Sequence, residues 1–171
     1  MSSITEKRWY LVQCKPKQDL RALENLRRQG YECLLPLHKI ERLRKGKWNI
    51  LEEPLFPGYL FIELDSLLDN WMPIRSTRGV SQIVRFGAEP ASVPEKIIWK
   101  LKQESTTPKK ELKPGDKIII KLAETTGFEA VFLAQTGSER VLILLNFLNR
   151  EIKLRTRTKG CFLAPEHVEL N

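Results

Sequence analysis

The sequence predicts a mixed α and β protein made of two units of unequal size. Patterns typical of strands and of helices alternate through the first hundred residues. A polar, proline-containing stretch at 104–111 is typical of a linker. A second unit of about 55 residues begins at Pro114-Gly-Asp116, a size at which small all-β barrels exist. We therefore expect domains at 1–104 and 114–171, joined by a linker at 105–113.

Short apolar or β-branched runs predict the strands of the first unit. They are residues 9–13, 32–39, 59–64 and 80–86. Residues 40–51 predict a hairpin whose tip is the basic segment 44–47. Residues 54–57 contain two prolines, which lack an amide donor, so this segment is expected to be an edge or a turn.

The first predicted helix spans residues 17–29 and has two contrasting faces. Its apolar stripe consists of Leu20, Leu23 and Leu26, and Gly30 is a typical helix stop. At ~100° per residue, the opposite stripe carries Gln18, Arg21, Asn25 and Gln29. Such side chains bond to base edges and phosphates. Taken alone, however, the pattern fits an ordinary helix with a solvated polar face better.

Two further helices are expected in the first unit. Residues 67–76 predict a short helix interrupted at Pro73. Pro94 is expected to open a last helix, which has Ile97, Ile98 and Leu101 on one face.

Charge is concentrated at the N-terminal end of the chain. The formal net charge is +8, and residues 1–47 hold twelve Lys or Arg against five acidic residues. A concentrated basic end favours a polyanionic partner, of which nucleic acid is the commonest. A merely solvated surface explains the same charge equally well.

Composition argues against several function classes. No apolar run approaches the ~20 residues that span a bilayer, and no signal peptide is recognisable, so we expect a cytoplasmic, monomeric protein that binds no membrane. The three cysteines have no metal-ligand spacing and are expected to be small buried hydrophobes. With two histidines and no phosphate-binding loop, the sequence predicts no enzyme activity, no metal and no cofactor.

Six sequence blocks, in this order, resemble the NusG family of transcription factors and, within it, the specialised RfaH branch. They are WYLVQCK at 9–15, EPLFPGYLF at 53–61, STRGV at 76–80, VRFG at 84–87, PGDKI at 114–118 and LLNFLNREIK at 144–153. The resemblance extends from about residue 8 to residue 154. Short blocks such as Pro-Gly-Asp are uninformative singly, whereas their order and spacing are specific.

The resemblance implies an N-terminal α/β sandwich with an antiparallel sheet. This domain would bind the β′ clamp helices and the β gate loop of RNA polymerase, and would suppress pausing and termination. The C-terminal domain would be a KOW module. In the specialised branch it is an α-helical hairpin that masks the polymerase-binding surface, or a β-barrel that recruits the ribosome through a small-subunit protein. Recruitment there depends on a hairpin in the single-stranded non-template DNA.

The resemblance also assigns residues to surfaces. The DNA-reading set is Lys15, Gln18, Arg21, Asn25, Gln29, Thr77 and Arg78. The polymerase-binding set is Tyr59, Phe61, Phe86 and Trp71, although aromatic residues are often ordinary core. The interdomain set is Glu53, Arg140, Phe132, Leu145 and Leu148, with a Glu53–Arg140 salt bridge.

This sequence departs from the branch at several of the matched positions. Pro16 and Asn25 replace an Arg and a His of the branch. Residues 70–73 replace the polar segment that contacts the gate loop. Residues 156–171 extend beyond the usual end of the family.

Residues 141–154 suit either a helix or two strands. As a helix, Val141, Leu144, Leu145, Leu148 and Ile152 fall on one face. As strands, apolar residues alternate and Asn149 turns a hairpin. We hypothesise that the free protein is autoinhibited, with the helical form covering Tyr59, Phe61 and Phe86. The alternatives are a general NusG-type factor with a permanent barrel, and an RNA-binding, ribosome-associated KOW protein.

Overall fold

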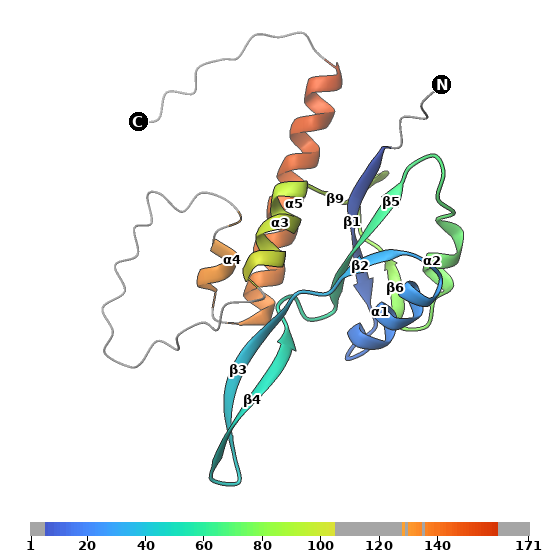
Figure 1. Cartoon of the computed structure of the whole chain (residues 1–171). Helices are drawn as coiled ribbons and strands as arrows, with labels where there is room; N and C mark the ends of the chain where they lie inside the picture. The colour runs from blue at the N-terminus through green and yellow to red at the C-terminus, as the bar shows by residue number, and fades with distance from the viewer. Residues whose placement is uncertain (1–5, 105–127, 129, 135, 161–171) are drawn as a thin grey trace, which may run out of the picture.

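The computed structural model describes residues 6–104, 128, 130–134 and 136–160 (Figure 1). The predicted linker, the predicted start of the second unit at Pro114 and Cys161 lie outside the described residues. Within these ranges, the chain forms one sheet with helices on both faces, a long two-stranded hairpin, and a C-terminal pair of helices.

The sheet is antiparallel and is built around its first strand. β1 (Lys7–Cys14) pairs with β5 (Tyr59–Asp65) on one side and with β6 (Val80–Ile83) on the other, giving the order β2-β5-β1-β6. β2 (Glu32–Leu34) completes the edge beside β5, and β9 (Ser92–Val93) also pairs with β1. This arrangement confirms the mixed α/β fold with an antiparallel sheet.

Alternation along β1 divides the interior into two cores. Trp9 and Leu11 belong to a core shared with the C-terminal helices, whereas Tyr10, Val12 and Cys14 belong to a core beneath the first helix. Successive side chains of a strand point to opposite faces of the sheet, which explains this division. Cys33 is also buried, as predicted.

α1 (Asp19–Arg28) exists as predicted, and its buried face includes Leu26 and, in part, Leu23 of the predicted leucine stripe, but not Leu20. Asp19, Ala22 and Leu26 are buried, while Leu20 is 64% exposed. The carboxylate of Asp19 accepts a hydrogen bond of 2.8 Å from the amide of Gly58. This contact holds the first turn with Asp19 facing inward, so Leu20 points into solvent.

The following elements refine the predicted boundaries. α2 (Met72–Ser76) holds Pro73 in its first turn instead of being interrupted by it, because proline suits the first turn of a helix. The predicted strand 80–86 divides into β6 and β7 (Arg85–Phe86), and β7 pairs with β8 (Glu89–Pro90). α3 (Glu95–Glu104) is confirmed, with Ile97, Ile98 and Leu101 buried.

The hairpin consists of β3 (Leu37–Arg44) and β4 (Lys47–Pro54) and projects from the body of the protein (Figure 1). Its tip is Lys45-Gly46, within the predicted segment, and the strand pattern ends at the proline-rich segment 54–57 as predicted. The predicted strand 32–39 divides into β2 and β3. Its break lies at Leu35-Pro36, where proline has no amide to pair.

The described C-terminal part is helical. α4 (Ala130–Leu133) and α5 (Gly137–Gly160) follow one another, and α5 runs through residues 141–154 without a break. The helix interpretation of this segment is therefore confirmed for this conformation. The strand interpretation, with a turn at Asn149, is wrong for it because Asn149 lies within the helix.

Candidate functional surfaces

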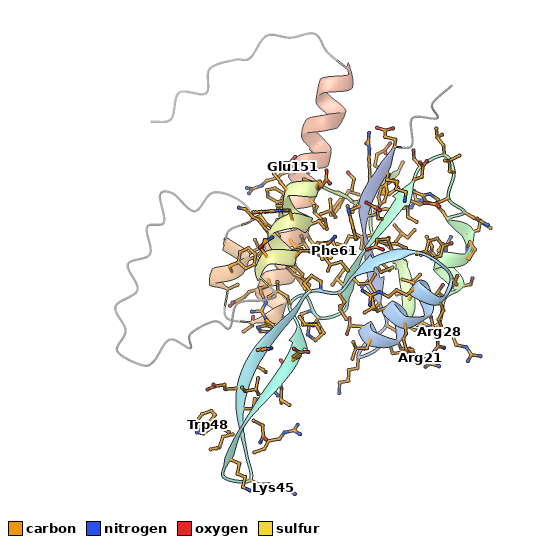
Figure 2. The ribbon with its side chains drawn as sticks, in the orientation of Figure 1. Arg21, Arg28, Lys45, Trp48, Phe61 and Glu151 are labelled. Atoms are coloured by element: carbon orange, nitrogen blue, oxygen red, sulfur yellow. The ribbon has the colours of Figure 1, made fainter. Side chains whose placement is uncertain are left out.

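α5 covers an apolar surface of the first unit. Leu144 and Leu148 are fully buried in the same core as Trp9, Leu11 and Phe61, and α3 contributes to this core too. Figure 2 shows Phe61 in the region between the sheet and the C-terminal helices. The described C-terminal helices therefore complete the core of the first unit.

Aromatic rings connect the two parts. Phe61 packs edge-on against Phe56 with ring centroids 5.9 Å apart, and Phe56 lies 6.4 Å from Phe128. Phe128 in turn contacts Phe132 and Phe147 at 5.6 Å and 6.0 Å. Phe56 and Phe128 were absent from the predicted set. Phe56 stands between Pro54 and Pro57 in the block EPLFPGYLF that carried the family resemblance, but no role was assigned to it.

The structure gathers three of the four predicted polymerase-binding residues. Phe61 is fully buried in the shared core, and Tyr59 and Phe86 are half-buried against it. Trp71 is not part of this group. It packs on Tyr10 in the other core, with ring centroids 4.7 Å apart, and its indole N–H donates to the carbonyl of Asp65.

Arg140 connects α5 to the first unit by hydrogen bonding. Its Nε donates to the carbonyl of Leu55 at 2.7 Å, its Nη1 donates to the carbonyl of Ala134 at 3.1 Å, and its Nη2 lies 3.4 Å from His38 Nε2. The residue is 7% exposed. Burial lowers the pKa of its guanidinium, and the carboxylates of Glu139 and Glu53 oppose that shift.

The other predicted interdomain residues lie at the same contact. Phe132 and Leu145 pack against the shared core, and Leu148 is buried in it. Glu53 is close enough to act on the pKa of Arg140, but its described ion pair is with Arg42, at 2.8 Å. The guanidinium of Arg140 instead bonds backbone carbonyls, which sequence alone gave no reason to expect.

The start of α5 fits tightly against the segment 55–58. A Cβ on Gly137 would lie 2.5 Å from Cγ of Pro57, so only glycine allows this approach. Thr136 and Glu139 cap the helix reciprocally, each accepting from the other's backbone amide. The position of α5 is therefore fixed at its first turn as well as along its apolar face.

The predicted DNA-reading residues come from three segments that meet at α1. The amide of Asn25 donates to the carbonyl of Arg78 at 3.1 Å, and the amide of Gln29 donates to Oγ1 of Thr77 at 2.8 Å. The backbone N–H of Lys15 donates to the carbonyl of Gly79 at 2.8 Å.

These contacts separate supporting residues from accessible ones. Thr77 is buried and its hydroxyl also donates to the carbonyl of Pro73, so it holds the turn in place. Lys15, Arg21 and Arg78 are exposed. We call these three cations the α1 ridge. Figure 2 shows Arg21 and Arg28 pointing outward from α1.

Gly79 makes the close packing of the ridge possible. Its φ is +96°, and a Cβ there would lie 2.7 Å from the backbone nitrogen of Ala22 on α1. The turn that carries Thr77 and Arg78 can therefore touch the helix backbone itself. The sequence block STRGV included this glycine, but the contact partner was not predictable from it.

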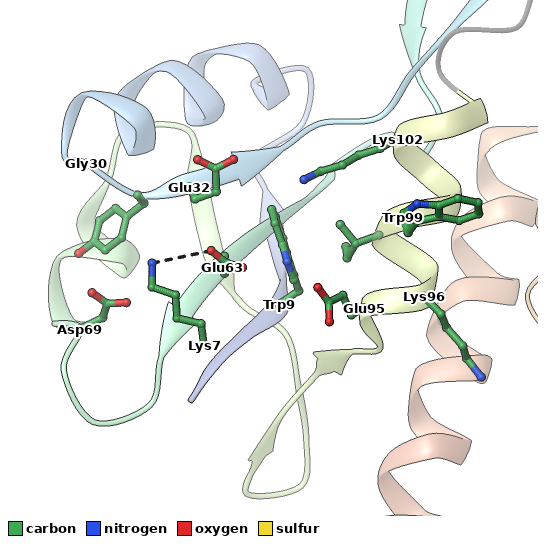
Figure 3. A pocket seen from close by; sticks show the side chains of 12 residues that line it. Lys7, Trp9, Gly30, Glu32, Glu63, Asp69, Glu95, Lys96, Trp99 and Lys102 are labelled. Carbon is green, nitrogen blue, oxygen red and sulfur yellow. Dashed lines mark ion pairs between the residues drawn. The ribbon is translucent and has the colours of Figure 1, made fainter. Parts of the chain in front are cut away.

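A cavity of about 690 Å³ lies between the sheet and α3 (Figure 3). Lys7 and Glu63 form an ion pair of 3.9 Å there, and Lys102 lies 5.2 Å from the ring centroid of Trp9. Among the residues that the structure describes, no group of His, Cys, Asp or Glu is arranged to hold a metal ion. None of the described helices is long and apolar enough to cross a bilayer.

Comparison with known proteins identifies the family. The family model described as "Transcription termination factor nusG" matches residues 7–102, more than half of the chain. The chain belongs to the NusG family. The matched range covers both the α1 ridge and the first-unit side of the contact with α5.

Relatives named transcription termination/antitermination protein NusG match at low identity. The NusG of Thermus thermophilus is 25% identical over 163 residues, covering 80% of this chain and 89% of that protein. The NusG of Staphylococcus aureus is 26% identical over 164 residues, covering 85% and 89%. The NusG of Chlamydia pneumoniae is 26% identical over 93 residues, which cover 49% of this chain. The match spans about half of the length of that relative.

A solved structure described as "Domain interaction in Thermotoga maritima NusG" aligns with this chain with a TM-score of 0.45 at 20% identity. The alignment covers 66% of this chain and 69% of that one.

Proposed function

We propose that this NusG-family chain is a transcription elongation and antitermination factor whose polymerase-binding surface is covered in the free protein. The observation that carries the proposal is the burial of Phe61, with Tyr59 and Phe86 packed beside it, under α5. An apolar, aromatic surface of this kind, if left uncovered, suits a protein partner. That partner is RNA polymerase, at its β′ clamp helices, where binding suppresses pausing and termination.

The α1 ridge supplies the second contact. Its three exposed cations would contact the phosphates of the non-template strand, while Gln18 and the amides of Asn25 and Gln29 lie beside them for base contacts. Because the amides of Asn25 and Gln29 also hold the turn at 77–79, base contact there would compete with existing hydrogen bonds. This arrangement supports recruitment of the factor to the transcribing polymerase by a DNA element, as in the operon-specific branch.

Release of α5 would link the two contacts. Residues 141–154 suit either helix or strands, so the released C-terminal unit could form the KOW barrel and recruit the ribosome through a small-subunit protein. A general NusG-type factor is the second candidate. It would bind polymerase without a DNA element, and the covered surface argues against constitutive binding.

The test is binding of the full chain to purified RNA polymerase. Leu148→Asp places a charge in the buried face of α5, whereas Leu142→Asp places the same charge on its exposed face, where Leu142 is 61% exposed. We expect Leu148→Asp to bind polymerase at least tenfold more tightly than the wild type and Leu142→Asp to behave as the wild type. Equal, strong binding by all three proteins favours the general factor. Binding by none contradicts the proposed partner.

A further inference from the structure

The β3–β4 hairpin ends in an apolar face that nothing in the described structure covers. Every residue from 41 to 50 is exposed, and Leu43, Trp48 and Ile50 are 58%, 66% and 67% exposed. Leu43 is paired directly with Trp48, and Ile50 with Glu41. Since residues two apart on a strand share a face, the three apolar side chains lie on one face of the ribbon.

The same tip is strongly basic. Arg44, Lys45 and Lys47 make no ion pair within the described residues, and no acidic residue lies between 42 and 48. Arg44 and Lys47 are directly opposite each other in the register. Like charges in such a pair destabilise a hairpin, so folding alone does not favour this choice of residues.

Lys45 itself occupies an unfavourable backbone position. The two central turn residues, Lys45 and Gly46, have φ of 50° and 73°. Two-residue hairpin turns with positive φ at both positions prefer Asn-Gly, since a long side chain in the left-handed region is disfavoured. A lysine here places a cation at the outermost point of the ribbon at a cost to stability.

We propose that the hairpin tip is a second DNA-binding surface, on which Trp48 stacks against an unpaired base while Arg44, Lys45 and Lys47 contact phosphates. Exposed aromatic rings among unpaired cations are the pattern by which proteins bind single strands. A protein groove would use the apolar face but would not call for the unpaired cations. An anionic lipid surface would use both, but the α1 ridge, which we assign to DNA, lies toward the same end of the molecule as the tip. The inference rests on the proposed function in that it assumes an unpaired DNA strand near the protein.

The position of the tip fits one DNA molecule reaching both surfaces. In Figure 2 the tip, marked by Lys45 and Trp48, and α1, marked by Arg21, lie toward the same end of the molecule. Each strand of the hairpin has eight residues, so the ribbon extends about 25 Å from its base. A strand bound at the α1 ridge would then continue along the hairpin.

The test measures binding of the full chain to a fluorescein-labelled single-stranded DNA of 20 nucleotides and mixed sequence, over a range of salt concentrations. Trp48→Ala is expected to weaken binding roughly tenfold, because stacking on one base is lost. Trp99→Ala is the matched control, since Trp99 is 63% exposed and lies on α3. It is expected to leave DNA binding unchanged.

A second variant separates DNA binding from hairpin folding. Lys45→Asn removes the charge but installs the residue that the turn prefers, so the thermal midpoint should stay equal or rise. We expect the salt slope of DNA binding to fall by about 0.7, the value for one lost contact to a single strand. An unchanged slope together with unchanged binding by Trp48→Ala overturns the inference.

The outcomes also distinguish this inference from the proposed function. If Arg21→Ala weakens DNA binding while both hairpin variants match the wild type, the ridge stands and the hairpin surface is wrong. If Trp48→Ala leaves DNA binding intact but weakens polymerase binding in the Leu148→Asp background, the ribbon is a protein-docking surface, which also overturns the inference. Loss of DNA binding by both hairpin variants, with polymerase binding retained, supports it.

Discussion

Removing one buried leucine from α5 should release the C-terminal helices. Leu144 is fully buried in the shared core, and truncating such a leucine to alanine costs roughly 2–5 kcal/mol in lost burial and cavity formation. If the whole cost falls on the covered state, the ratio of covered to uncovered protein changes by roughly 30-fold to several thousandfold, since 1.4 kcal/mol is a factor of ten. Leu142→Ala, at an exposed position of the same helix, should change the ratio little.

The assay is a titration of RNA polymerase with the full-length variants. Apparent affinity rises in proportion to the uncovered fraction and levels off when that fraction approaches one. Hydrogen exchange of β5 and β9 provides an independent measure, because α5 packs over the core that contains Phe61 and Val93. If Leu144→Ala and Leu142→Ala have the same polymerase affinity and the same exchange, α5 does not control access to this surface, and the reasoning is refuted.

Three further predictions concern the rest of the structure. Gly79→Ala should lower the free energy of unfolding by more than Gly87→Ala does. A Cβ at Gly87 meets no atom within 4 Å and adds only backbone strain of about 1–2 kcal/mol, whereas a Cβ at Gly79 also meets the backbone of α1. Urea unfolding of both variants measures the difference. Burial raises the pKa of the Cys14 and Cys33 thiols from 9.0 to about 12. Both thiols should therefore resist alkylation at pH 8.5 until the protein unfolds, and rapid labelling detected by peptide mass spectrometry would contradict this. The free energy of unfolding should also fall as pH rises from 9 toward 12, because the unfolded thiols ionise first. Arg21→Ala should reduce the salt slope of single-stranded DNA binding by about 0.7, and an unchanged slope would exclude a phosphate contact there.

Sequence patterns predicted the elements of the first unit better than their orientation. Strand and helix positions followed from apolar runs, prolines and Gly30. Of the leucine stripe of α1, Leu26 is buried and Leu23 packs against the core, but Leu20 points into solvent, because the tertiary hydrogen bond between Asp19 and Gly58 turns Asp19 inward. A hydrogen bond between residues 39 positions apart leaves no local signal in the sequence.

The candidate surfaces were predictable only in part. The family resemblance placed Phe61 and Arg140 at the contact between the two parts, and the structure brings them there. It did not supply His38 or Phe128, because neither has a pattern around it. Trp71 was also predicted to bind polymerase, but it packs in the other core, on the opposite side of the sheet from Phe61.

The central claim is that α5 covers the surface that binds polymerase, and a reversible crosslink tests it most directly. Cysteines at positions 57 and 137 would join two segments in contact, and replacing Pro57 also removes the ring atoms that a Cβ on Gly137 would otherwise meet at 2.5 Å. In the Leu144→Ala background, the reduced protein should bind RNA polymerase, the oxidised protein should lose that binding, and the single Pro57→Cys variant should be insensitive to oxidation. Undiminished binding by the oxidised, crosslinked protein would contradict the account.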